Sequence, residues 1–187
     1  MPPRRRGISD DHDAGHANRS PAGVPGHPWQ VIEIQALAPA DWRAWRTCGL
    51  LRWPRRRLRS GPGWPTGRTR RRKRWRDRLA ITGSVNFVAL LKGKPAGMAS
   101  GVPGEDAIPQ LISMWVSPRG RGKGIGDRLV HEVAQWARSQ GAPAPRLAVA
   151  EGNQHAAALY RRNGFTDTGE LVGSPPDRIR ILVKQLR

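Results

Sequence analysis

A glycine-rich segment between a predicted strand and a predicted helix is the part of the sequence best suited to chemistry. Glycines alternate with other residues from Gly120 to Gly126, and Arg121 and Lys123 stand between them. Glycine lets the backbone curl with its N–H groups pointing inward. The first turn of the following helix adds unsatisfied N–H donors and a partial positive charge. Together these groups predict a binding site for a phosphate or pyrophosphate.

Other phosphate-binding loops match this segment poorly. Strictly alternating glycines do not fit the G-x-G-x-x-G pattern of dinucleotide-binding proteins. A P-loop needs Ser or Thr after its Gly-Lys pair, but Gly124 follows Lys123, and Ser117 stands where that loop has its first glycine. The remaining alternative is a glycine-rich turn that holds no ligand.

The elements that must position this segment follow from the hydrophobic pattern. The apolar stretches predict strands and helices, and the helical stripe from Ile125 ends at Gly141, where a left-handed cap belongs. Three strands with short loops indicate an antiparallel meander, and the rest alternates helix with strand. The sequence therefore predicts an α/β (α+β) fold with a mixed, mostly antiparallel sheet and helices on both faces. The strands are expected at residues 31–34, 87–91, 96–102, 108–116, 147–150 and 179–186, and the helices at 41–51, 75–81, 125–140 and 154–163.

The positive charge is concentrated in one window. The 187-residue chain carries a net charge of +19. Residues 46–78 hold fourteen Arg or Lys and one acid, Asp77, and so contribute +13 of this charge. Within this window, residues 52–78 form an Arg/Pro/Gly-rich insert with three readings: nucleic-acid binding through phosphate contacts, a solvated disordered loop, or a block read out of frame in the gene. Residues 1–28 lack apolar periodicity and are predicted to be a disordered tail.

Cysteine content and apolar runs limit the class of protein. Cys48 is the single cysteine, which excludes an internal disulfide. No apolar run approaches the roughly 18 residues of a transmembrane helix, and no apolar segment follows Arg4–Arg6, so neither a membrane span nor a signal peptide is predicted. We expect a cytoplasmic protein with no metal site and no membrane partner. A homodimer stays open.

Two motifs together resemble the GNAT acetyltransferase family. Residues 121–126, Arg-Gly-Lys-Gly-Ile-Gly, look like the family's R/Q-x-x-G-x-G/A loop. About thirty residues further on, 153–165 look like its N-x-x-A-x-x-L-Y-x-x-x-G-F segment, with Ala156 in register. Residues 87–89 and 95–97 are similar to its second and third strands. The resemblance covers about residues 31–51 and 75–186, and it makes 29–187 a GNAT domain that follows the tail.

The resemblance implies an acetyl-CoA-dependent N-acetyltransferase whose substrate amine, on a small molecule or a protein, attacks the thioester directly. Asn153 would contact acetyl-CoA, although it is equally a helix N-cap. Tyr160 would protonate the departing thiolate, since a phenol and a thiol are comparably weak acids; the alternative is a core tyrosine. Backbone groups of Met114, Trp115 and Val116 would bind the pantetheine arm, and the N–H groups of Arg121, Gly122, Lys123, Gly124, Ile125 and Gly126 would hold the pyrophosphate.

The general base and the acceptor are not identified by the sequence. A backbone N–H of the strand at 108–116 would stabilise the oxyanion. Glu151 and Glu105 lie nearby in sequence, but neither occupies a position that matches a catalytic glutamate of the family. An acyl-CoA-binding protein without turnover, or a nucleic-acid-binding protein that uses residues 52–78, therefore remains an alternative.

Overall fold

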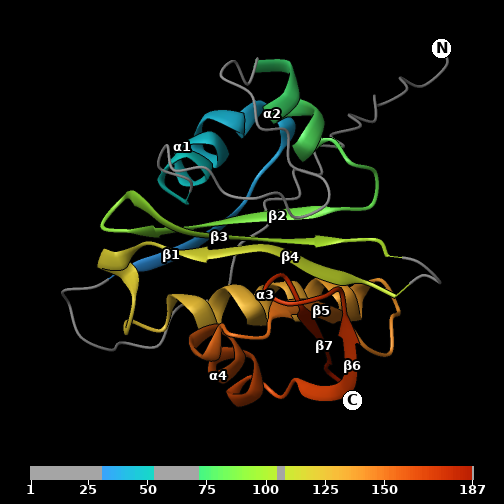
Figure 1. The fold of residues 1–187 in the computed structure, drawn as a ribbon. Coiled ribbons are helices and arrows are strands. Elements are labelled where there is room, and N and C mark those ends of the chain that lie inside the picture. Colours follow the sequence, from blue (N-terminus) through green and yellow to red (C-terminus); the bar gives the residue numbers. More distant parts are fainter. Residues whose placement is uncertain (1–30, 53–71, 105–107, 187) are drawn as a thin grey trace, which may run out of the picture.

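The structure, a computed structural model, describes residues 31–52, 72–104 and 108–186. The predicted tail, residues 53–71 of the Arg-rich insert and Glu105 lie outside the described residues. A seven-stranded sheet in the order β1-β2-β3-β4-β5-β7-β6 organises the chain (Figure 1). Every neighbouring pair is antiparallel except β4 and β5. The predicted mixed, mostly antiparallel sheet is confirmed.

The boundaries of most elements lie within a few residues of those predicted. The strands are β1 (Ile32–Ala36), β2 (Val85–Leu91), β3 (Lys94–Val102), β4 (Gln110–Val116), β5 (Arg146–Ala150), β6 (Thr166–Val172) and β7 (Ile179–Val183). The helices are α1 (Trp42–Arg52), α2 (Arg72–Leu79), α3 (Ile125–Ser139) and α4 (Gln154–Arg162), with 3-10 turns at Pro39–Asp41 and Pro118–Gly120. In the described parts of the chain, no helix is both long and apolar enough to cross a membrane.

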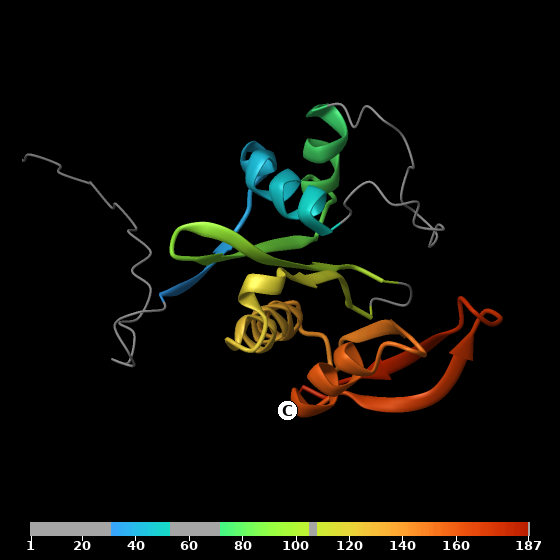
Figure 2. The same cartoon turned by 60° about the vertical axis from the view of Figure 1, so that its left-hand side comes forward.

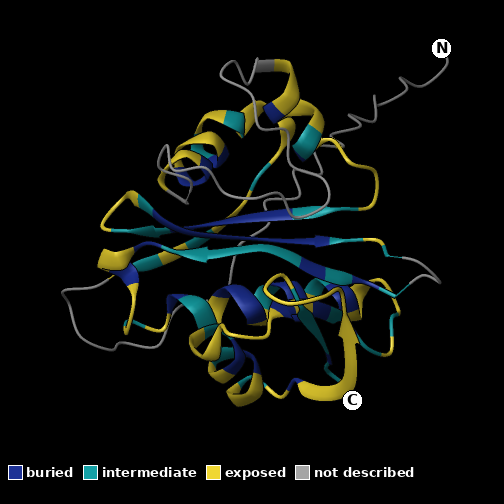
Figure 3. Ribbon diagram, in the orientation of Figure 1, coloured by how far each residue is buried: buried dark blue, intermediate teal, exposed yellow. Residues whose placement is uncertain are grey.

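Helices cover both faces of the meander, as predicted (Figures 1 and 3). On one face α3 buries Ile125, Leu129 and Val133 against β2 and β3. Gly101 allows this close approach, because a Cβ there would lie 2.3 Å from a ring carbon of Trp136 on α3. On the other face α1 and α2 pack over a second apolar cluster: Trp45, Cys48, Trp75, Leu79, Val88 and Met98.

The prediction of a single strand after α4 was wrong. The chain forms two strands there, and β6 (Thr166–Val172) is the edge of the sheet beside β7. All seven residues of β6 are exposed, so the alternation of buried and exposed residues that reveals a strand in sequence is missing. The predicted final strand also ends at Val183 rather than at residue 186. The second helix begins at Arg72, before the predicted start.

Candidate functional site

The one parallel strand pair separates almost as soon as it forms. β4 and β5 are in register only at Gln110 and Arg146, where the Arg146 N–H donates to the carbonyl of Pro109 at 2.8 Å. Beyond that point β5 continues beside β7 and β4 beside β3, so the two halves of the sheet diverge (Figure 2). The β5-facing edge of residues 111–116 has no strand partner among the described residues. Met114, Trp115 and Val116 lie on this edge, where the pantetheine prediction needs open backbone groups.

A bulge sits in the middle of the same edge. Ser100 of β3 is opposite Ile112, but Met98 is opposite Trp115, so β4 holds one extra residue across this interval. Ser113 supplies the bulge with φ 57°, a value that is uncommon for a residue other than glycine and costs about 1–3 kcal/mol. Its buried Oγ has no hydrogen-bond partner in the described ranges. The near-continuous apolar pattern of this strand gave no sign of the bulge.

The glycine-rich segment adopts the curled backbone predicted for it. Gly122 (φ 71°) and Gly124 (φ 77°) are left-handed, and a Cβ on either would meet nothing within 4 Å, so conformation rather than space requires glycine there. Gly120 is different, since its Cβ would lie 2.8 Å from Cδ1 of the fully buried Ile125. Gly120 therefore packs against Ile125, whereas Gly122 and Gly124 face open space.

The start of α3 is suited to an anion. Gly124 is the N-cap and has no side chain to accept from the first-turn N–H groups, which leaves those donors available to a ligand. Arg121 is exposed and Lys123 partly exposed beside them. Backbone donors, the positive end of the helix dipole and two cations therefore coincide, as an anionic pyrophosphate requires.

The single acid in this first turn is neutralised from α4. The carboxylate of Asp127 accepts from Nε and Nη2 of Arg162 at 2.6 and 2.8 Å, and from Nδ2 of Asn163 at 2.7 Å. The Arg162 guanidinium holds the pKa of Asp127 below its usual value. A close contact supports the same junction, because a Cβ on Gly126 would lie 3.1 Å from Leu159. This link was missed in the sequence, since its partners lie 35 residues apart.

Asn153 and Tyr160 lie at the two ends of α4. Asn153 caps the helix, with its Oδ1 accepting from the N–H of Ala156 at 3.1 Å. The structure thus accounts for this side chain without a ligand, and contact with acetyl-CoA stays a prediction.

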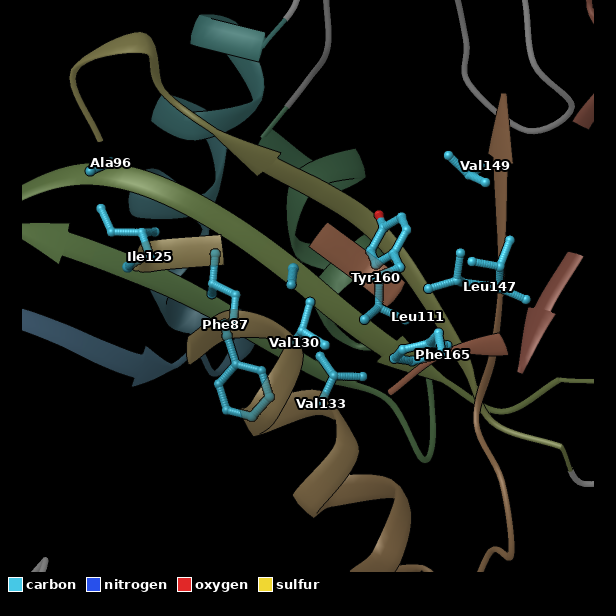
Figure 4. Packing of buried hydrophobic residues seen from close by; sticks show 14 residues of the cluster. Phe87, Ala96, Leu111, Ile125, Val130, Val133, Leu147, Val149, Tyr160 and Phe165 are labelled. Carbon is cyan, nitrogen blue, oxygen red and sulfur yellow. The ribbon is translucent and has the colours of Figure 1, made fainter. Parts of the chain in front are cut away.

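Tyr160 is buried and belongs to the apolar core, where its ring meets Phe165 edge-on at 6.0 Å between centroids. Figure 4 shows its hydroxyl directed away from Phe165, on the side of the gap between β4 and the strand that carries Leu147 and Val149. The ring therefore packs as a core tyrosine does while its hydroxyl faces the diverging strands. Proton transfer by this hydroxyl stays a prediction.

The structure does not favour either candidate glutamate as the general base. Glu151 is engaged by two arginines, with Arg178 Nη1 at 3.6 Å and Arg180 Nη2 at 3.3 Å. Glu105 lies outside the described residues. Within the described ranges no group of three or more His, Cys, Asp or Glu side chains could hold a metal ion.

A mixed sheet that opens between β4 and β5, with a helix start suited to an anion beside the opening, fits an enzyme that binds a phosphate-containing acyl donor. The sequence model of the Acetyltransferase (GNAT) family matches residues 41–165, which is most of the chain. The chain belongs to this family, and the resemblance of the two motifs is confirmed.

Individual relatives agree with this assignment. N-acetyltransferase family 8 member 3 of Mus musculus is 32% identical over 110 residues, which cover 56% of this chain and 49% of the relative. Thialysine N-epsilon-acetyltransferase of Bos taurus is 38% identical over 63 residues, which cover 34% of this chain and 37% of the relative. This chain thus spans half or less of the length of these curated relatives.

Solved structures share the fold. A GNAT-family acetyltransferase from Streptococcus pneumoniae superposes with a TM-score of 0.67 at 20% identity and covers 84% of this chain and all of its own. An acetyltransferase from Bacillus anthracis, solved in complex with acetyl coenzyme A, has a TM-score of 0.54 at 20% identity over 59% of this chain and 67% of its own.

Proposed function

We propose that this protein transfers the acetyl group of acetyl-CoA to a primary amine of a small molecule or a protein. The observation that carries the proposal is the opening between β4 and β5 at its single registered pair, with the glycine-rich start of α3 beside it. Acetyl-CoA is the co-substrate: the family of acetyltransferases to which the chain belongs uses an acetyl donor, and the Bacillus anthracis structure was solved with acetyl coenzyme A.

Each part of acetyl-CoA has a matching part of the site. The backbone of residues 114–116 would bind the pantetheine arm as an added strand binds an open edge. The N–H groups of residues 121–126 would hold the pyrophosphate, with Arg121 and Lys123 adding charge. Asn153 would contact the cofactor at the start of α4.

The reaction proposed is direct transfer. The nitrogen of a neutral amine attacks the thioester carbonyl, the C–N bond forms, and the C–S bond breaks to release CoA thiolate. A backbone N–H at the bulge in β4 would stabilise the oxyanion. Tyr160 would donate its phenolic proton to the thiolate and recover a proton from the ammonium by way of solvent. No described carboxylate is assigned as base, since an amine that arrives neutral needs none.

Release of free CoA thiol, followed with a thiol reagent over a panel of amines, tests this proposal. Tyr160→Phe keeps the ring and its contact with Phe165 but removes the hydroxyl. We expect kcat to fall about 100-fold or more, while acetyl-CoA stabilises wild type and variant equally against thermal unfolding. An unchanged kcat would assign Tyr160 to the core alone.

A second candidate is an acyl-CoA-binding protein without turnover. The ion pairs that occupy Glu151 favour it, because they engage the described carboxylate nearest the end of β5. Stabilisation by acetyl-CoA without thiol release from any amine would support this reading. The domain at 29–187, a cytoplasmic location, a homodimer and nucleic-acid contact through 52–78 remain predictions from sequence.

A further inference from the structure

The α1/α2 face of the sheet holds a partly buried guanidinium that has only neutral partners among the described residues. Arg78 of α2 donates from Nη1 to Oδ1 of Asn86 at 3.2 Å and from Nη2 to Oγ of Ser100 at 3.1 Å. Asn86 and Ser100 are themselves fully buried and joined, with Ser100 Oγ donating to Asn86 Oδ1 at 2.8 Å. In the described ranges no carboxylate forms an ion pair with Arg78.

Burying the Arg78 guanidinium without a counter-ion among the described residues lowers the stability of the fold, which is unusual for a residue with a purely structural role. Removing a guanidinium from water without a counter-ion costs free energy, and burial lowers the pKa of Arg78 accordingly. The group nevertheless stays charged. A stack over the Trp45 ring, 5.7 Å from its centroid, offsets part of the cost. The two bonds to Asn86 and Ser100 use one N–H on each of Nη1 and Nη2 and fix the guanidinium plane. The other three N–H donors have no hydrogen-bond partner among the described residues, and Nε–H with a neighbouring Nη–H forms a fork of the kind that binds a carboxylate.

The Arg78 guanidinium lies on the same part of the sheet as the opening between β4 and β5. Ser100 is in register with Ile112, the residue before the bulge at Ser113. The guanidinium bonds to β2 through Asn86 and to β3 through Ser100, and adjacent strands lie about 4.8 Å apart, so β4 is roughly one and a half strand spacings away. The opposite face is filled by the core that α3 and Tyr160 share. We therefore expect an amine to reach the opening from the face of the sheet opposite α3, which α1 and α2 cover (Figure 1) and on which Arg78 of α2 contacts β3.

We propose that Arg78 binds a carboxylate of the acceptor, so that the preferred substrates are amines that also carry a carboxylate. The proposal deepens the proposed acetyl transfer and rests on it. Other cations of α2, among them Arg76, are exposed, and they would attract anions only through screened long-range charge. Selectivity should therefore depend on Arg78 and not on the charge of the helix.

Matched acceptors test this directly. The variants Arg78→Gln and Arg76→Gln remove the same charge from the same helix, and Arg78→Lys keeps the charge without the fork. Acetylation of 4-aminobutanoate and 5-aminopentanoate is compared with that of their amides, which are of equal length and uncharged at that end. We expect wild type and Arg76→Gln to favour the acids at least 10-fold in kcat/KM, mainly through KM. Arg78→Gln should lose this preference, Arg78→Lys should keep part of it, and the KM for acetyl-CoA should not change.

A binding measurement separates this proposal from the proposed function. Succinate and succinamide are added, each with and without acetyl-CoA, and thermal unfolding is followed. Succinate should raise the Tm of wild type and Arg76→Gln but not of Arg78→Gln, and succinamide should raise none. Equal effects of the acid and its amide on wild type, or an unchanged preference in Arg78→Gln, would overturn the proposal. Absence of any response to acetyl-CoA would instead overturn the proposed function, while the succinate result would still decide the role of Arg78.

Discussion

Gly124→Glu gives the sharpest test of the anion site, because α3 supplies its own control. Gly124 precedes the helix with φ 77° and Gly141 follows it with φ 72°, and a Cβ on either would meet nothing within 4 Å. Glutamate at either position therefore brings the same backbone strain, about 1–2 kcal/mol, and the same charge. The helix dipole favours a glutamate at position 124 over one at position 141 and so changes the Tm of the free variants, but only Gly124 lies where the pyrophosphate is expected to change the response to acetyl-CoA.

The expected size of the effect follows from ligand linkage. Acetyl-CoA at about 100 times its Kd stabilises a folded protein by roughly 2.7 kcal/mol, which corresponds to a rise in Tm of about 5–10 °C for a domain of this size. We expect this rise in wild type and in Gly141→Glu. In Gly124→Glu it should vanish, because the new carboxylate lies against the pyrophosphate and its side chain fills the cradle.

Thermal unfolding with and without acetyl-CoA, followed by circular dichroism, is the assay. Gly124→Ala and Gly141→Ala repeat the comparison without charge and separate strain from repulsion. A full rise in Tm for Gly124→Glu would refute the placement of the pyrophosphate at this loop. Loss of the rise in both glutamate variants would show that the effect comes from strain in α3 rather than from the site.

Three further predictions concern the scaffold around the site. Gly101→Ala should lower the free energy of unfolding by about 1–3 kcal/mol in denaturant titration, because its Cβ has no room beside α3, while Gly152→Ala, in open space, should be neutral. Asp127→Asn should cost about 0.5–1 kcal/mol at pH 7, since the pair with Arg162 is half exposed; because the pKa of Asp127 is lowered in the fold, this difference should disappear as pH falls below about 4. Cys48, whose pKa burial raises to about 12, should resist iodoacetamide at pH 8 in the native protein and react on unfolding.

The parts of the fold that the sequence predicted are those with an apolar helical stripe or a continuous apolar run. The stripe of α3 is buried on one side of the helix, and β2 and β3 are buried over several consecutive residues, on both faces; burial is what creates both patterns. Turns marked by glycine were predicted equally well. One example is Gly93, whose positive φ closes the turn between β2 and β3. β6 lacked both kinds of signal because all its residues are exposed.

The site was predictable only in its local part. The loop at 121–126 is continuous in sequence, so residue types alone indicate an anion-binding helix start. Contacts between residues far apart in the sequence could not be predicted from residue types in this way. Asp127 meets Arg162, and Arg78 meets Ser100, across separations of 35 and 22 residues, and polar residues at such distances have no preferred spacing. The bulge at Ser113 was hidden for another reason, since a left-handed serine gives no compositional sign.

The strained Ser113 and the Arg78 guanidinium without a carboxylate partner among the described residues both lie at one interval of β3 and β4. The left-handed backbone of Ser113 costs about 1–3 kcal/mol, and it lies in the strand whose backbone N–H is proposed above to stabilise the oxyanion. On β3 the same interval is bounded by Met98, which packs in the cluster under α1 and α2, and by Ser100, which accepts a hydrogen bond from Arg78. Two features that weaken the isolated fold thus meet at one interval of β3 and β4. That convergence is expected of a place where substrates, rather than the chain alone, complete the interactions.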